Sequence, residues 1–190
     1  MRCKILALTL TFATQVDADC GILCDRDWWN NATATSLQAE LDAGADVMAQ
    51  DRWGTSPLFL ASQISSPDLI NALLTAGADV TVRDVNDRTP LHWASSDGTP
   101  ANIKALLAAG ANVLARGKAG KSPLHMAAVR GTPANIEALL AAGANITAAD
   151  EDGETPLHSA AVGGTPATIK ALLMAGADVM VLDTDRETPL

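Results

Sequence analysis

Tyrosine is missing from this 190-residue sequence and phenylalanine occurs only twice, so a core must be built from Ala, Leu, Ile and Val. The three cysteines are too few for a scaffold held by disulfides. Positive charge is also scarce, because 13 lysines and arginines face 22 aspartates and glutamates, for a net charge of −9. Non-specific nucleic-acid binding depends on lysine and arginine, so this balance argues against a nucleic-acid partner. After the first residues, no apolar run approaches the roughly 20 residues of a membrane span.

The first eighteen residues have the pattern of an export signal. Arg2 and Lys4 give a basic start, residues 5–13 form a short apolar run, and a more polar stretch ends at Ala18 before a cleavage site. This apolar run is too short to cross ~30 Å of hydrocarbon as a helix. We therefore predict a signal peptide at residues 1–18 and export to the periplasm or the cell exterior. An apolar first helix packed on the rest of the chain is the alternative that the sequence leaves open.

A short motif of the form Ser/Thr-Pro-Leu recurs every 33 residues, usually with histidine after it. Its copies begin at Ser56, Thr89, Ser122, Thr155 and Thr188. A glycine within Ala-Gly-Ala keeps the same spacing, at Gly44, Gly77, Gly110, Gly143 and Gly176. Two markers in phase over four intervals indicate an internal repeat.

A 33-residue period with Thr-Pro-Leu-His resembles the ankyrin-repeat family. Residues 20–47, with their tryptophan pair, weakly resemble the N-terminal caps of exported bacterial ankyrin proteins. The ankyrin-repeat resemblance covers roughly residues 18–190. It implies an all-α solenoid in which each repeat is a short hairpin or turn, here called a finger, followed by two antiparallel helices. We expect a degenerate capping repeat at 19–50, full repeats at 51–83, 84–116, 117–149 and 150–182, and the start of another at 183–190.

The residues themselves support paired helices. Thr89 can cap a first helix, and Pro90 fits the first helical position, where no amide hydrogen is needed. Thr99 and the proline after it repeat this arrangement for a second helix that runs to about residue 109. Gly110 then supplies the left-handed residue that closes a helix.

Core positions follow from the repeat alignment. Leucines and isoleucines share three columns: Leu58, Leu91, Leu124 and Leu157; Ile70, Ile103, Ile136 and Ile169; and Leu73, Leu106, Leu139 and Leu172. The second helices therefore carry an apolar stripe. No single repeat can bury its stripe alone, so neighbouring repeats must stack.

The two ends of the array depart from the pattern. In the degenerate first repeat Glu40 takes the position of a core leucine, which suits an outer face that meets water. Trp28 and Trp29 are expected to cover the remaining apolar surface of this cap. At the other end the last full repeat is apolar, and the sixth stops at Leu190, where its first helix should begin. We expect an array that is truncated, continues in a longer gene product or covers this end by association.

The three histidines argue against a catalytic or metal site. His92, His125 and His158 occupy the same position of successive repeats, and stacked helices lie roughly 8–10 Å apart. Zinc needs its nitrogen ligands about 2 Å from the metal and hence about 3–4 Å from one another, so histidines that lie one per repeat cannot readily form a metal site. The resemblance implies that each histidine hydrogen-bonds the backbone between repeats, with Phe59 as a departure. Nucleophile and phosphate-loop motifs are missing too, so we predict no catalytic residue, cofactor or metal.

Cys20 and Cys24 lie four residues apart after the predicted cleavage site. In an oxidising compartment they could form a local disulfide that braces the N-terminal cap. Two free thiols or a redox pair are the alternatives, although no Cys-x-x-Cys motif is present. Cys3 would leave with the signal peptide.

The variable residues of the fingers remain as a candidate surface, because ankyrin repeats usually contact partners there and on the first helices. Carried over by position, the candidates are Arg52, Trp53, Arg83, Asn86, Arg88, Arg116, Lys118, Lys121, Arg130, Glu151, Asp152 and Glu154. They predict an edge that is basic in the middle and acidic toward the end, with Trp53 as an aromatic anchor. Ordinary solvated charge is the alternative.

We therefore predict an exported scaffold that binds a partner protein through its fingers and concave face. A secreted effector or toxin-neutralising inhibitor would use the same surface. A different class, the non-catalytic part of a larger enzyme, would need a catalytic domain elsewhere in the gene product.

Overall fold

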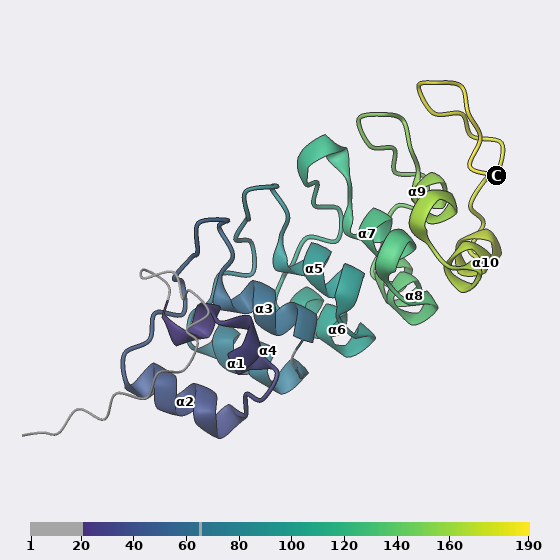
Figure 1. Cartoon of the computed structure of the whole chain (residues 1–190). Coiled ribbons are helices and arrows are strands. Elements are labelled where there is room, and N and C mark those ends of the chain that lie inside the picture. Colours follow the sequence, from purple (N-terminus) through teal and green to yellow (C-terminus); the bar gives the residue numbers. More distant parts are fainter. Residues whose placement is uncertain (1–20, 65) are drawn as a thin grey trace, which may run out of the picture.

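The computed structural model describes residues 21–64 and 66–190, and the regular secondary structure in these residues is helical. The predicted signal peptide, Cys3 and Cys20 lie outside the described residues. The helices stack in pairs along an elongated array, and loops project as fingers from one edge (Figure 1). The predicted all-α repeat solenoid is confirmed. None of the helices in the described part is both long and apolar enough for a membrane span.

Each repeat contributes a first and a second helix. The first helices are α1 (Arg26–Trp29), α3 (Pro57–Ile64), α5 (Pro90–Asp97), α7 (Pro123–Arg130) and α9 (Pro156–Gly163). The second helices are α2 (Ala34–Asp42), α4 (Pro67–Thr75), α6 (Pro100–Ala108), α8 (Pro133–Ala141) and α10 (Pro166–Met174). Two short 3-10 helices are η1 (Ile22–Cys24), before α1, and η2 (Lys118–Gly120), in a finger.

The Thr-Pro pairs start the helices as predicted. At α6 the Thr99 hydroxyl accepts a hydrogen bond of 3.2 Å from the Asn102 N–H, and Pro100 takes the first helical position. Gly110 follows the helix with a φ of 92°, the left-handed conformation that closes it. Equivalent caps begin α8 and α10.

The core lies between neighbouring helix pairs along the whole array. Eleven of the twelve predicted column residues are almost completely buried, with at most 1% exposure at Leu58, Leu91, Leu124, Leu157, Ile70, Ile103, Ile136, Leu73, Leu106, Leu139 and Leu172. The exception is Ile169 on α10, which is only partly buried because no described helix pair packs on the outer face there. Buried alanines bring the first helices close together: Ala61, Ala94, Ala127 and Ala160. Because each stripe is covered by the next repeat, the stability of a repeat depends on its neighbours.

The connection between first and second helices passes very close to the preceding repeat. A Cβ atom on Gly131 would lie 2.5 Å from the carbonyl oxygen of Ser95 and 2.8 Å from that of Ala127. Gly98 and Gly164 face the preceding repeat in the same way. Sequence reasoning missed these glycines, although a Gly-Thr-Pro triplet that recurs every 33 residues was a visible signal.

The two ends of the array differ in how well they are covered. Trp29 is only 2% exposed, and its Nε1–H donates a hydrogen bond of 2.8 Å to the Leu23 carbonyl oxygen. Trp28 packs edge-on against it at 4.9 Å between ring centroids, so the tryptophan pair covers the N-terminal cap as predicted. On α9 and α10 the outer face is open, with Val162 85% and Met174 79% exposed.

Candidate partner-binding surface

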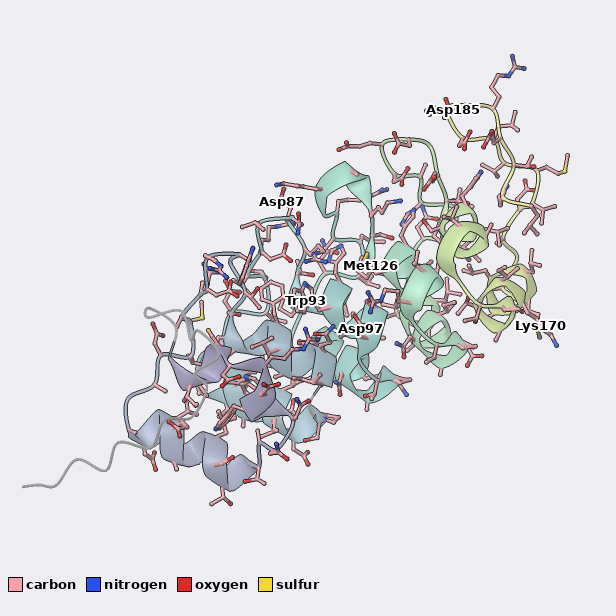
Figure 2. The ribbon with its side chains drawn as sticks, viewed as in Figure 1. Asp87, Trp93, Asp97, Met126, Lys170 and Asp185 are labelled. Atoms are coloured by element: carbon pink, nitrogen blue, oxygen red, sulfur yellow. The ribbon has the colours of Figure 1, made fainter. Side chains whose placement is uncertain are left out.

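The fingers form a row beside the first helices. They lie at residues 51–55, 84–88, 117–121, 150–154 and 183–187, and the backbone N–H of the first residue in each donates to the carbonyl of the fifth. Figure 2 shows Asp87 and Asp185 on fingers, and Lys170 at the opposite edge of the array.

Backbone hydrogen bonds tie each finger to the next. The Val85 N–H donates to the Trp53 carbonyl at 2.9 Å, and the Lys118 N–H donates to the Asn86 carbonyl at 2.8 Å. The Glu151 N–H continues the series toward residue 119, at 3.0 Å. The candidate surface is therefore a linked row with a fixed spacing between fingers.

In most fingers an aspartate at the first position accepts hydrogen bonds from backbone N–H groups of the same finger. The Asp84 Oδ1 accepts hydrogen bonds from the backbone N–H groups of Asn86 (2.8 Å) and Arg88 (3.0 Å). The same pair of bonds forms at Asp51, Asp150 and Asp183. Such side-chain turns fix the backbone of a short loop.

The third finger lacks this aspartate, because Gly117 stands in its place. Here the backbone winds into η2, and Ala119 adopts a left-handed φ of 57°. Sequence reasoning missed this difference. The signal was a glycine in a column that otherwise holds aspartate, and the result is one finger with a shape of its own.

Two of the predicted binding arginines are exposed and also support the fingers. The Arg83 Nη1 donates to the carbonyl of Asp87 in its own finger and to that of Arg116 in the next repeat, at 2.6 and 2.8 Å. Arg116 repeats the pattern with the carbonyls of Gly120 and Ala149, both at 2.6 Å. Each guanidinium thus braces two neighbouring loops.

Lys121 joins the predicted basic part of the edge to the acidic part. Its Nζ lies 2.8 Å from the Asp150 carboxylate and 3.0 Å from the Glu154 carboxylate. Burial disfavours the charged ammonium, but the two hydrogen bonds outweigh this and raise the pKa of Lys121 above its ordinary value. The basic-then-acidic edge is therefore partly neutralised by its own contacts.

Two further cations differ in how they are used. Arg130 pairs with Asp97 at 2.9 Å across neighbouring first helices. Lys118 is exposed, and in the described part of the chain its ammonium group makes no hydrogen bond or ion pair. Lys118 therefore offers both its charge and its hydrogen-bond donors to a partner.

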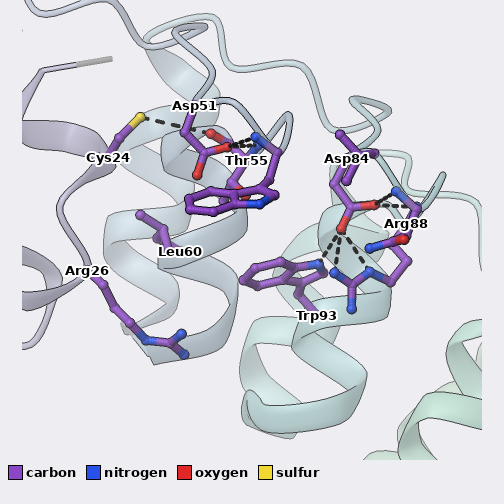
Figure 3. A pocket seen from close by; sticks show the side chains of 11 residues that line it. Cys24, Arg26, Asp51, Thr55, Leu60, Asp84, Arg88 and Trp93 are labelled. Atoms are coloured by element: carbon purple, nitrogen blue, oxygen red, sulfur yellow. Dashed lines mark hydrogen bonds and ion pairs between the residues drawn. The ribbon is translucent and has the colours of Figure 1, made fainter. Parts of the chain in front are cut away.

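A hollow of about 360 Å³ lies between the first two fingers and the helices beside them (Figure 3). Eleven residues line it: Cys24, Arg26, Asp51, Trp53, Thr55, Leu60, Asp84, Val85, Asn86, Arg88 and Trp93. Trp53, Asn86 and Arg88 were predicted as candidates, and the structure brings them together here. Trp93 was not predicted, although a large aromatic residue directly after His92, the histidine of the repeat motif, was a visible signal.

The Trp93 ring is held in place on three sides. Its Nε1–H donates a hydrogen bond of 3.1 Å to the Asp84 Oδ2, which also accepts from the Arg88 Nε at 2.8 Å. The Arg88 guanidinium lies 5.1 Å from the ring centroid, and Phe59 packs edge-on at 5.5 Å. Trp53 is half exposed, with the Arg52 guanidinium 3.8 Å from its ring centroid.

Two smaller hollows meet the first one around Arg88, and we call the three together the groove. One, of about 170 Å³, is lined by Arg26, Gln63, Arg88, Trp93, Ser96, Asp97, Met126 and Arg130. The other, of about 230 Å³, is lined by Asn86, Arg88, His92, Gly117, Lys118, Ala119, Lys121 and Met126. The groove runs from α1 to the third finger.

The histidines link consecutive repeats through the backbone, as the resemblance implied. The His92 Nδ1 accepts a hydrogen bond of 3.1 Å from the Thr89 N–H, so the proton of the neutral ring lies on Nε2, which donates to the Lys121 carbonyl at 3.1 Å. His125 and His158 reach the Glu154 and Glu187 carbonyls at 3.0 and 3.3 Å. Phe59 has no nitrogen for this bond and instead packs on Trp93.

Protonation of these buried histidines is unfavourable. Burial lowers the pKa of His92 to about 4 and also lowers that of His125. The unfolded chain therefore binds more protons than the native one below about pH 6.5, and stability is lost as the pH falls from there toward 4. The lowered pKa values of Asp84 and Asp150 act only below this window.

We expect the free energy of unfolding to fall by about 2 kcal/mol for His92 alone between pH 7 and pH 5. Urea denaturation at the two pH values measures this loss. The control is His92→Phe, which copies Phe59 and removes the titrating ring. The variant should be less stable at pH 7 but show a smaller loss between the two pH values. An equal loss in both proteins would contradict this assignment.

The acidic fingers form no metal site that the structure supports. Within residues 21–64 and 66–190, no group of three or more histidine, cysteine or acidic side chains is placed to hold a metal ion. Glu151 and Asp152 are exposed, while Glu154 pairs with Lys121. These residues contribute charge to the surface.

Cys24 is disulfide-bonded, and its Sγ lies 3.9 Å from the Thr55 carbonyl oxygen at the rim of the groove. The other two cysteines of the sequence, Cys3 and Cys20, lie outside the described residues. The pairing of Cys20 with Cys24 therefore stays a prediction.

The sequence model of a family described as ankyrin repeats (three copies) matches residues 29–117 and again residues 100–183. A search of the curated proteins found no match to this chain.

Proposed function

Because this chain belongs to the ankyrin-repeat family, whose members generally bind other proteins, we propose that it is an exported, non-catalytic scaffold that holds a protein partner in its groove. The observation that carries the proposal is the groove itself. Side chains of three fingers and four first helices (α1, α3, α5 and α7) line it, and Arg88 lines all three of its hollows. No nucleic-acid partner, cofactor or metal forms part of this proposal.

The groove has features that suit protein binding. Its two tryptophans and Met126 provide apolar contact area, and Asn86, Arg88 and Lys118 surround them with polar groups. Tryptophan and arginine are the side chains most enriched among residues that dominate binding energy. The hydrogen-bonded fingers also fix the surface in advance, which lowers the entropy cost of association.

Site-specific photocrosslinking in the producing cells tests the proposed surface. A photoreactive residue in place of Asn86, at the rim of the groove, should trap a protein partner. The matched control is Lys104, equally exposed but on α6, away from the fingers. Crosslinks at both positions, or at Lys104 alone, would show that binding does not use the groove.

Export is the second part of the proposal. The basic and apolar start of residues 1–18 supports it, and so does the disulfide at Cys24, since disulfides persist mainly outside the reducing cytosol. A secreted inhibitor would use the same groove, and loss of the partner's own activity on binding would identify that role. Membership of a larger enzyme as a non-catalytic part remains the alternative of another class.

Intact-mass measurement of the exported protein checks this part. We expect a mature chain that begins at Asp19, with a mass two hydrogens lower than the reduced form because of a disulfide between Cys20 and Cys24. Deletion of residues 5–13 should keep the protein inside the cell. A full-length chain outside the cell, or no export at all, would contradict the predicted signal.

A further inference from the structure

The groove carries information about the chemistry of its partner, and this inference rests on the function proposed above. We infer that the groove binds an extended acidic segment of the partner protein, with one bulky apolar side chain held between Trp53 and Trp93. The carboxylates of the segment lie toward Lys118, one finger further along the array.

The apolar part of the inference rests on the hollow between the first two fingers. Trp53 and Trp93 both line it, and so does Leu60, which is only 6% exposed. Its volume of about 360 Å³ is at the lower end of the range typical of ligand sites, which suits one large side chain. Trp93 is already fixed by Asp84 and Phe59, so little order is lost when a partner side chain enters.

The acidic part rests on the charge of the groove. Five cationic side chains line it, namely Arg26, Arg88, Lys118, Lys121 and Arg130. Three carboxylates line it, namely Asp51, Asp84 and Asp97. Asp84 and Asp97 are bound by Arg88 and Arg130. Lys121 pairs with Asp150 and Glu154 beside the groove. Among the described residues no carboxylate binds the lining cations Arg26 and Lys118, so a chain with a net charge of −9 has cationic groups here that are complementary to carboxylates.

The positions of the two contacts set the spacing of the segment. Lys118 belongs to the hollow between the second and third fingers, and this hollow shares Asn86 and Arg88 with the tryptophan hollow. Neighbouring repeats are roughly 8–10 Å apart, and an extended chain rises about 3.3 Å per residue. The carboxylates are therefore expected about three residues from the apolar anchor.

Fluorescein-labelled synthetic peptides test the inference by anisotropy against the full chain. The probe is a Gly/Ser peptide with one tryptophan and, three residues later, a pair of glutamates. A peptide with lysines instead of the glutamates, and one with alanine instead of the tryptophan, should each bind about tenfold more weakly or worse. Raised salt should weaken binding of the acidic peptide, because its charge contact is exposed.

Variants of the chain assign the two contacts. Trp53→Ala should lower the affinity for the acidic peptide by about tenfold or more. Lys118→Glu should lower it similarly and raise the affinity for the lysine peptide. Both side chains are exposed, so neither change should unfold the array. The matched controls are Val162→Ala, an exposed apolar residue on α9, and Lys104→Glu on α6. Both controls should bind the peptide as the unchanged chain does.

Failure of this inference can be told apart from failure of the proposed function. Three results would overturn the inference that the groove binds an acidic segment. They are equal affinity for the acidic and lysine peptides, competition by free N-acetyltryptophanamide as strong as by the peptide, and no peptide binding. A crosslinked protein partner at Asn86 would still support the proposed function in that case. If neither the peptides nor the photoreactive Asn86 position finds a partner, both ideas are wrong.

Discussion

Replacement of Gly131 by alanine is expected to destabilise the array by about 3 kcal/mol or more. The new Cβ would lie 2.5 Å from the Ser95 carbonyl oxygen and 2.8 Å from the Ala127 Cα and carbonyl oxygen. All three atoms belong to the backbone of packed first helices, so they cannot move aside as a side-chain end can. The Ser95 carbonyl also accepts from the Asn135 Nδ2 at 3.3 Å, and displacement would weaken that contact between repeats.

Gly163→Ala is the matched control for this prediction. A Cβ there would lie 2.8 Å from the Val129 Cγ1, the end of a side chain that can rotate, and the position is at the end of α9. Alanine favours a helix over glycine by up to about 1 kcal/mol, so the net change should be small. Urea denaturation followed by circular dichroism measures both variants. Equal midpoints for Gly131→Ala and Gly163→Ala would show that the close approach is not a real constraint.

Repetition made the fold readable from the sequence alone. The 33-residue period aligned the core leucines, the helix caps and the histidines that link repeats, so a role assigned at one position could be assigned to its equivalents in the other repeats. Gly131 and its equivalents were missed for a related reason. A glycine needed for close backbone approach has no apolar or capping character, so only the distance to the neighbouring repeat reveals its role.

The candidate surface was harder to predict, because a position in the repeat alignment does not determine the conformation of a long side chain. Arg83 and Arg116 are exposed, and each also donates a hydrogen bond to a loop carbonyl of the next repeat, which their positions in the columns did not predict. Lys121 likewise turns to Asp150, so one charge of the predicted basic edge is used in an ion pair within the chain. Trp93 lies on the first helix α5, and the candidates predicted for the first helices did not include it.

Asp84 connects the stability of the array to the shape of the groove. Its side chain is only 1% exposed, and its oxygens accept from two backbone N–H groups, the Arg88 guanidinium and the Trp93 indole. Burial disfavours the charge, yet the hydrogen bonds from Arg88, from the finger backbone and from Trp93 together lower the pKa of Asp84. The carboxylate is therefore ionised at neutral pH and is the common acceptor for the finger and the ring.

Asp84→Ala is expected to cost about 3 kcal/mol, because it leaves several buried donors without an acceptor and separates Arg88 from its partner. The matched control is Asp51→Ala, where only the two finger N–H groups, of Trp53 and Thr55, lose their acceptor. We expect that change to cost about 1 kcal/mol. Urea denaturation measures both costs. In Asp84→Ala the Trp93 ring is no longer held, so the affinity for the tryptophan-containing peptide should also fall. Asp84→Asn should partly restore that affinity. Equal costs for the two alanine variants, with unchanged peptide binding, would mean that Asp84 supports its finger but does not position Trp93.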